Sequence, residues 1–183
     1  MDDDETPEEG LRPLDEARRE DRAARAAATK VHGIIPYGFF SAASSECREL
    51  YLDGHFYGCI SLSQAVAEGL SKFVCRVHSV RKTKDPEKRV RRLAKKGLIS
   101  AEARAAFLTI WGNDRNTFHH LNEDITDDSA ELGGRAKECV DALYVIESEI
   151  FAFELAEGAI RPLKPEYWPT TEPGRLAVYL RLA

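Results

Sequence analysis

Apolar residues recur along this chain at intervals of three and four, a spacing that places them on one face of an α-helix. The clearest run of apolar side chains consists of Cys59, Leu62, Val66, Leu70, Phe73 and Val77. It predicts one helix of about six turns. A preceding helix is predicted over residues 39–52, ending near Asp53-Gly54, and the two are expected to pack as a helical hairpin.

Two later helices carry recognisable start signals. Asp85-Pro86-Glu87 predicts a short helix that ends at Gly97, because proline is well tolerated at the first helical position. Ser100 is a good N-cap for the next helix. That helix is expected to bury Ala103, Phe107, Ile110 and Trp111 and to be interrupted at Gly112-Asn113-Asp114.

A long closing helix is predicted from its apolar face, which comprises Val140, Leu143, Ile146, Ile150 and Phe153. We place its start after Gly133-Gly134, because paired glycines disfavour helix. Together these patterns predict an all-α protein with a bundle of four to five helices over residues 36–158.

The two ends of the chain differ from this bundle. Residues 1–35 are predicted to form an acidic arm, disordered over residues 1–10 and helical over 11–28, where few large apolar side chains are available for burial. Residues 159–183 form a Pro-rich C-terminal extension. Within it, residues 176–180 predict either a short strand or an apolar latch against the bundle.

Composition and motifs narrow the class of protein. A chain of 183 residues fits one domain with arms. It has no apolar stretch of about 20 residues and begins with an acidic segment, so we expect a cytoplasmic protein without membrane contact. It also lacks a Gly-rich phosphate loop and the H-E-x-x-H and G-x-S-x-G motifs. Four scattered cysteines are predicted to be small buried side chains: Cys47, Cys59, Cys75 and Cys139.

The net charge of −5 conceals a basic segment over residues 76–96, which carries ten lysines and arginines. Such a density suits contact with a phosphate backbone. The candidate RNA-binding side chains are Arg89, Arg91, Arg92, Lys95 and Lys96. The alternative interpretation is an ordinary solvated helix face.

The run Arg115-Asn116-Thr117-Phe118-His119-His120 combines a permanent cation with imidazoles that exchange protons near neutral pH. Spacing alone does not identify it. Arg25 with His32, and Arg48 with His55, satisfy a similar loose spacing rule. We interpret His32, His55 and His78 as structural. A functional interpretation of the Arg115–His120 run therefore depends on the residues around it.

That context resembles the HEPN superfamily. The run follows Leu93-x-x-x-Gly97-x-Ile99-Ser100 and a helix ending in Trp111-Gly112-Asn113, and it precedes a long amphipathic helix. Upstream, the segment from Tyr51 to Ile60 leads into Ala65-Val66-Ala67-Glu68. The resemblance covers about residues 38–157, and its hallmark is arginine, a polar residue that is often asparagine, three more residues, then histidine.

The resemblance implies a helical bundle that dimerises so that two such motifs face each other. Many members are metal-independent endoribonucleases of toxin–antitoxin, abortive-infection and other defence systems, which implies no cofactor and a possible antitoxin or defence partner protein. Other members are not catalytic. Here the alternative is a HEPN-like module that binds RNA, a nucleotide or a partner protein, and a third hypothesis is a helical adaptor that uses residues 2–28.

For catalysis, Arg115 is the candidate phosphate clamp, His120 the candidate base or acid, and Asn116 the group that orients them. A regular helix would instead place His119 on the face of Arg115, with His120 about 140° away, so both histidines remain candidates. The bland alternative is that these side chains only cap a helix or pair with Glu123 and Asp124.

Overall fold

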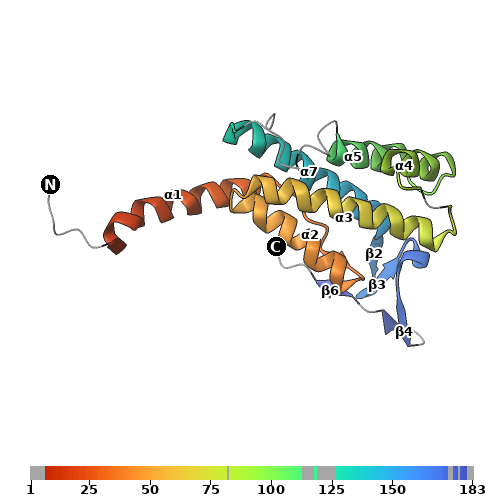
Figure 1. Ribbon diagram of the computed structural model, residues 1–183. Coiled ribbons are helices and arrows are strands. Elements are labelled where there is room, and N and C mark those ends of the chain that lie inside the picture. Colours follow the sequence, from red (N-terminus) through yellow and green to blue (C-terminus); the bar gives the residue numbers. More distant parts are fainter. Residues whose placement is uncertain are drawn as a thin grey trace.

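The chain is mostly helical. A computed structural model describes residues 7–81, 83–112, 118, 127–172, 175–176 and 178–180. The α-helices in these ranges are α1 (Pro7–Ala27), α2 (Gly38–Leu52), α3 (Phe56–Val77), α4 (Pro86–Lys95), α5 (Ala101–Trp111) and α7 (Ser129–Ile150) (Figure 1). Within the described ranges, no helix combines the length and the hydrophobicity needed to cross a lipid bilayer.

The central helix of the bundle is α3, which packs against α2, α4, α5 and α7. The predicted hairpin of α2 and α3 is confirmed, and its turn lies at Asp53-Gly54. Gly54 has φ +80°, a backbone conformation that favours glycine. The apolar spacing therefore predicted both helices and the turn between them.

The predicted starts of α4 and α5 are confirmed by their capping hydrogen bonds. The Asp85 carboxylate accepts a hydrogen bond from the Lys88 amide at 3.0 Å. The Ser100 hydroxyl accepts one from the Ala103 amide, also at 3.0 Å. Each cap satisfies an amide at the helix start that has no partner within its helix.

The predicted start of α7 is wrong. The helix begins at Ser129, where the Asp128 carboxylate accepts a hydrogen bond from the Ala130 amide at 2.8 Å, and it continues through Gly133-Gly134. A Cβ on Gly133 would lie 3.1 Å from the Phe56 ring, so glycine there allows the first turn of α3 to approach. The helix ends at Ile150, and Phe153 belongs to the following strand.

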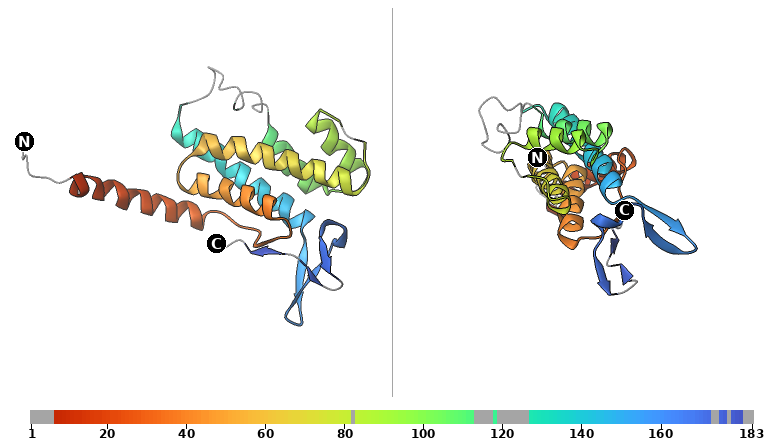
Figure 2. Two further views of the ribbon diagram at one scale, coloured as in Figure 1. Left: turned by 60° about the horizontal axis from the view of Figure 1, so that its bottom comes forward. Right: turned by 90° about the vertical axis from the view of Figure 1, so that its right-hand side faces the viewer.

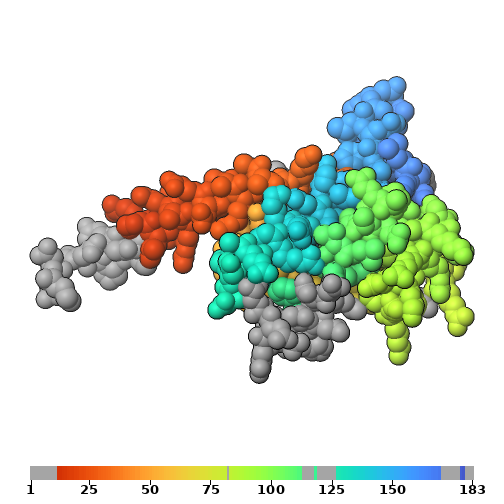
Figure 3. Space-filling view, turned by 90° about the horizontal axis from the view of Figure 1, so that it is seen from above, coloured from red at the N-terminus to blue at the C-terminus, as the bar shows by residue number. Residues whose placement is uncertain are grey.

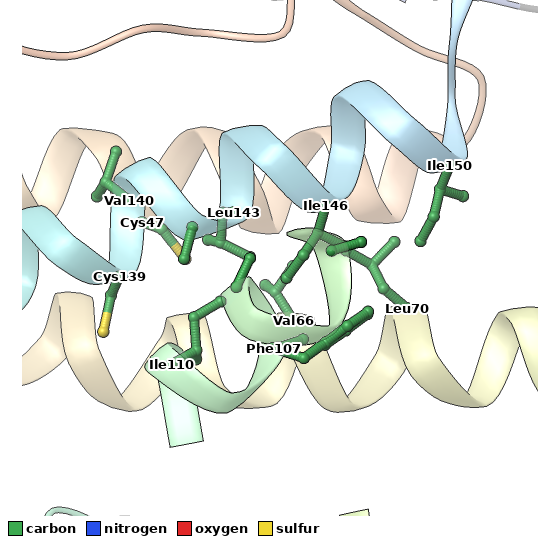
Figure 4. Packing of buried hydrophobic residues seen from close by; sticks show 14 of the residues in the cluster. Cys47, Val66, Leu70, Phe107, Ile110, Cys139, Val140, Leu143, Ile146 and Ile150 are labelled. Atoms are coloured by element: carbon green, nitrogen blue, oxygen red, sulfur yellow. The ribbon is translucent and has the colours of Figure 1, made fainter. Parts of the chain in front are cut away.

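The hydrophobic core lies where α7 meets α2, α3 and α5. Leu143, Ile146 and Ile150 of α7 are buried there with Phe107 of α5 and Leu70 of α3 (Figure 4). All four cysteines are buried outside any disulfide, which confirms their predicted role as small core side chains. The described residues contain no group of three metal-ligating side chains.

Short strands follow the bundle, so the chain is not purely α-helical. β2 (Phe153–Ala156) and β3 (Ala159–Pro162) form a hairpin, so the last helix of the bundle ends at Ile150, before the end of the bundle predicted at residue 158. The other elements are β1 (Ile34–Ile35), the 3-10 helix at Pro165–Tyr167, β4 (Thr170–Glu172), β5 (Arg175–Leu176) and β6 (Tyr179–Leu180). β6 pairs antiparallel with β1, which returns the C-terminal segment to the start of α2.

Helix α1 extends away from the bundle (Figures 1 and 2). Its side chains from residue 12 to 20 are all exposed. Arg22 forms ion pairs with Glu49 and Asp53 at the end of α2. The predicted helical arm is observed as one helix that is held to the bundle near its C-terminal end. The prediction of disorder is wrong for residues 7–10, because α1 begins at Pro7.

Candidate nucleic-acid interface

Four of the predicted site residues lie outside the described residues: Arg115, Asn116, His119 and His120. The structure describes Phe118 within the run, Gly112 before it and the chain from Asp127 onward after it. These neighbours show which helices lead into and out of the predicted site.

Helix α5 ends at Gly112, which has φ +43°. The guanidinium of Arg135, on α7, lies directly against Gly112, where any added Cβ would collide with it. Arg135 also pairs with Glu138 through Nη1 at 3.0 Å. A cation is therefore placed at the point where α5 leads into the predicted site.

Phe118 is the one described member of the run and is only 8% exposed. Its ring centroid lies 6.0 Å from that of Tyr57, in the first turn of α3. Tyr57 itself is 39% exposed. The prediction that Trp111 is buried is confirmed, since it is 1% exposed. The middle of the run is thus packed against the bundle beside a solvent-accessible aromatic ring.

The basic helix α4 has one buried arginine, Arg89, which was among the five candidates for RNA contact. Arg89 is 3% exposed, and it donates hydrogen bonds to Ser71 Oγ at 3.0 Å and to the Thr83 carbonyl at 2.8 Å. A carboxylate oxygen of Glu68 lies 3.8 Å away. Arg89 therefore holds α4 to α3 and does not lie on the surface that RNA would contact.

Three of the other candidates are exposed, namely Arg91 and Lys95 of α4 and the adjacent Lys96. Arg91 has a side chain that is 62% exposed and pairs with Glu87 at 3.2 Å, and Lys95 and Lys96 are exposed. Arg92 is half-buried and donates to the Arg81 carbonyl at 2.8 Å. Helix α5 packs against both α4 and α7, and the space-filling view shows residues of α4 and α5, in green, on one face of the molecule (Figure 3). The exposed basic surface therefore has fewer cationic side chains than the sequence predicted, but these side chains are accessible to solvent.

The remaining histidines divide into two kinds. His32 is buried with Nε2 3.1 Å from the Phe151 carbonyl, and His78 Nε2 lies 2.8 Å from the Tyr167 hydroxyl, as structural histidines should. His55 at the N-cap of α3 is exposed, so the expectation that it packs is wrong. It lines a polar cavity of about 530 Å³ between α1 and the α2–α3 turn.

The cysteines are poor candidates for nucleophilic chemistry. Burial raises the pKa of Cys59 to about 12 and that of Cys139 to about 11. A thiol with such a pKa is protonated at neutral pH, and it is the thiolate that attacks. Cysteine catalysis at these two positions is therefore excluded.

Comparison of the chain with family models, with curated proteins and with solved structures gives no match. The geometry nevertheless adds two residues that sequence reasoning missed, Tyr57 and Arg135, both beside described neighbours of the run. The sequence gives little indication of these two contacts, because the apolar spacing of a helix does not relate Tyr57 to Phe118 or Arg135 to Gly112. The burial of Arg89 had a clearer signal, since Pro86, Val90 and Leu93 share its helix face.

Proposed function

We propose that this protein is a HEPN-type endoribonuclease, a toxin or defence effector, that cuts RNA without a metal through Arg115, Asn116 and His120 in a homodimer. The observation that carries the proposal is the burial of Phe118 against Tyr57. This contact packs Phe118, which lies between α5 and α7 in the sequence, against the helical bundle. The exposed cations of α4 supply a surface for the RNA backbone.

The chemistry suits these side chains. An imidazole takes the proton of the ribose 2′-hydroxyl, whose oxygen attacks the adjacent phosphorus. Arg115 stabilises the charge that builds on the non-bridging phosphorane oxygens. The 5′-oxygen then leaves with a proton from an acid, so the products are a 2′,3′-cyclic phosphate and a 5′-hydroxyl.

The proposed reaction needs two proton transfers. One imidazole does not easily perform both in a single pass, so His119 or a motif from a second subunit supplies the other. Where a second subunit supplies it, dimerisation is part of the proposed mechanism, with a two-fold axis that brings two motifs together.

The test is RNA cleavage in EDTA, with cyclic phosphate ends identified by mass spectrometry. We expect His120→Ala and Arg115→Ala to reduce cleavage by at least about a hundredfold without changing thermal unfolding. His55→Ala and Arg104→Ala are matched controls, because both side chains are exposed elsewhere on the bundle. Full activity in either motif variant would rule out the assignment.

The second candidate is a HEPN-like module that binds RNA, a nucleotide or a partner protein without cutting. The outward cations of α4 favour its RNA-binding form, because they are accessible whether or not the motif is catalytic. Replacing Arg91, Lys95 and Lys96 by glutamine should weaken RNA binding and reduce its salt slope by about 2. The matched control, Arg161→Gln, removes one exposed cation of the β2–β3 hairpin. RNA binding without cleavage by the wild type would favour this candidate over the ribonuclease.

A further inference from the structure

A groove of about 460 Å³ runs between α2 and α3, which lie side by side in the left view of Figure 2. Its lining on α3 extends from Leu62 to Arg76. It begins more than one turn after Tyr57 and so lies apart from the proposed RNA site.

The groove is open because small residues line it where two packed helices would otherwise present larger side chains. Ala43, Ala65 and Gly69 are among the lining residues. A Cβ on Gly69 would lie 3.2 Å from the Phe40 ring, so glycine allows the buried aromatic wall to come close. At the rim, Phe39 is 61% exposed, an unusual position for a phenylalanine in a helix that has a core to face.

The charge of the groove has one sign. Lys72 and Arg76 are the charged residues that line it, both on α3, and no carboxylate does. Lys72 pairs with Glu68 outside the groove at 2.8 Å. The Arg76 guanidinium lies 5.5 Å from the centroid of the Phe73 ring. An apolar floor with cations toward one end selects a ligand that is apolar on one face and acidic at its edge.

We propose that this groove binds an acidic amphipathic helix of another protein. The α3 lining spans 14 residue steps, about 21 Å at the rise of an α-helix, which matches a ligand helix of about four turns. Apolar side chains of the ligand at positions i, i+4 and i+7 enter between α2 and α3 beside Phe39. A carboxylate near one end of the ligand pairs with Arg76.

Charge argues for a different protein rather than a second copy. In a two-fold symmetric dimer, the groove of one copy would face the groove of the other. The charged residues that line the groove are cations, so like charges would meet. Helix α1 of a second copy is also a poor occupant. In its described side chains from residue 12 onward, Leu14 is the one large exposed apolar residue.

The test uses a labelled synthetic peptide of 16 residues with leucines at i, i+4, i+7 and i+11 and glutamates elsewhere, crosslinked to be helical. Its binding to the full chain is followed by fluorescence anisotropy. We expect saturable binding, at least tenfold weaker binding of the same peptide with lysine for glutamate, and threefold to tenfold weaker binding to Arg76→Gln. Arg91→Gln on α4 is the matched control.

A second variant tests the location. Ala65 is exposed and lines the groove, so Ala65→Glu should abolish binding by placing a carboxylate on its floor. Ala105→Glu, at an exposed alanine of α5, should not change it. Equal binding of both peptides, or an Ala65→Glu variant that binds normally, would overturn the proposal.

The experiments also distinguish two other occupants of the groove, a second copy of this chain and a lipid membrane. If the wild type is a dimer by sedimentation and Ala65→Glu makes it a monomer, a second copy fills the groove and the proposal is wrong. If vesicles of phosphatidylserine compete with the peptide and bind the protein through Phe39, the surface belongs to a membrane and the proposal is also wrong. RNA cleavage should be unaffected in Ala65→Glu, so the groove and the proposed ribonuclease can fail independently.

Discussion

Helices α1 and α7 are nearly equal in length, with 21 and 22 residues, but they are stabilised in different ways. Nine residues of α7 are buried, most of them apolar. None of the described side chains of α1 is buried. Helix-forming composition is thus common to both, whereas only α7 gains stability from burial.

What α1 has instead is charge. Arg22 pairs with Glu49 and Asp53, and Arg25 donates to the Leu52 carbonyl at 2.7 Å. Ion pairs between exposed groups contribute about 0–1 kcal/mol each and weaken with salt. The position of α1 therefore depends on ionic strength, whereas α7 is held mainly by buried apolar contacts. Four measurements test this difference.

The largest effect is expected at the centre of α7. Ile146 is fully buried, so Ile146→Ala should lower the free energy of unfolding by about 3–4 kcal/mol through lost burial and a residual cavity. Urea denaturation measures it, and Ile146→Val, with an expected loss of about 1 kcal/mol, is the control. A loss below about 1 kcal/mol for the alanine variant would contradict the assignment of α7 to the core.

The next effect concerns the buried thiols of α3 and α7. The pKa values of Cys59 and Cys139, about 12 and about 11, lie above the ordinary value of about 8.5. The folded chain therefore holds these protons more tightly, so this stabilisation is complete below about pH 8 and is lost as the pH rises through about 9–12. We expect a loss on the order of 2 kcal/mol between about pH 8 and 10.

Urea denaturation at a series of pH values checks this expectation. The double variant Cys59→Ala, Cys139→Ala is less stable at neutral pH, but its stability should fall less steeply above about pH 9. An unchanged slope would show that other groups, such as buried tyrosines, cause the alkaline loss. The amides of α1 should not report it in hydrogen exchange, because α1 contains no thiol.

A smaller gain is expected within α7 itself. Gly134 has open space where a Cβ would be added, so Gly134→Ala should raise the free energy of unfolding by about 0.5–1 kcal/mol. In Gly133→Ala the new Cβ meets the Phe56 ring, and the gain should vanish or reverse. Thermal unfolding of the two variants measures this contrast, and equal shifts would contradict the close approach of α3 to α7.

The smallest global effect is expected in α1. Arg22→Ala should change the free energy of unfolding by less than about 0.5 kcal/mol, because its partners are exposed. Hydrogen exchange of the α1 amides should nevertheless speed up several-fold, and 1 M NaCl should do the same to the wild type. Arg18→Ala, one turn earlier and exposed, is the control. Exchange in α1 that ignores both changes would show that α1 is held by something other than charge.

Much of the bundle was predictable because its signals are local. The apolar spacing of α3 and the caps Asp85 and Ser100 each depend on residues within a turn or two, and all are confirmed. The start of α7 was not, because the tolerance of Gly133 depends on a ring that lies far away in the chain. Phe39 could have been noticed, since adjacent phenylalanines in a helix lie about 100° apart and cannot both face one core.

The candidate site was predicted only as a run of residues. Its members Arg115, Asn116, His119 and His120 stay predictions, and so does the question of which histidine acts. Net charge and spacing did not separate Arg89 from Arg91, although one holds helices together and the other faces solvent. Whether an arginine of α4 is buried or exposed depends on which face of α4 packs against α3.

Most of the helices, the caps Asp85 and Ser100 and the burial of the cysteines followed from the sequence, because periodicity, capping and composition act over a few residues. Only the tertiary structure decided that β6 returns to β1, that Tyr57 and Arg135 flank described neighbours of the motif, and that a cationic groove opens between α2 and α3. Each of these depends on contacts between residues far apart in the chain, and such contacts form only when the whole core packs.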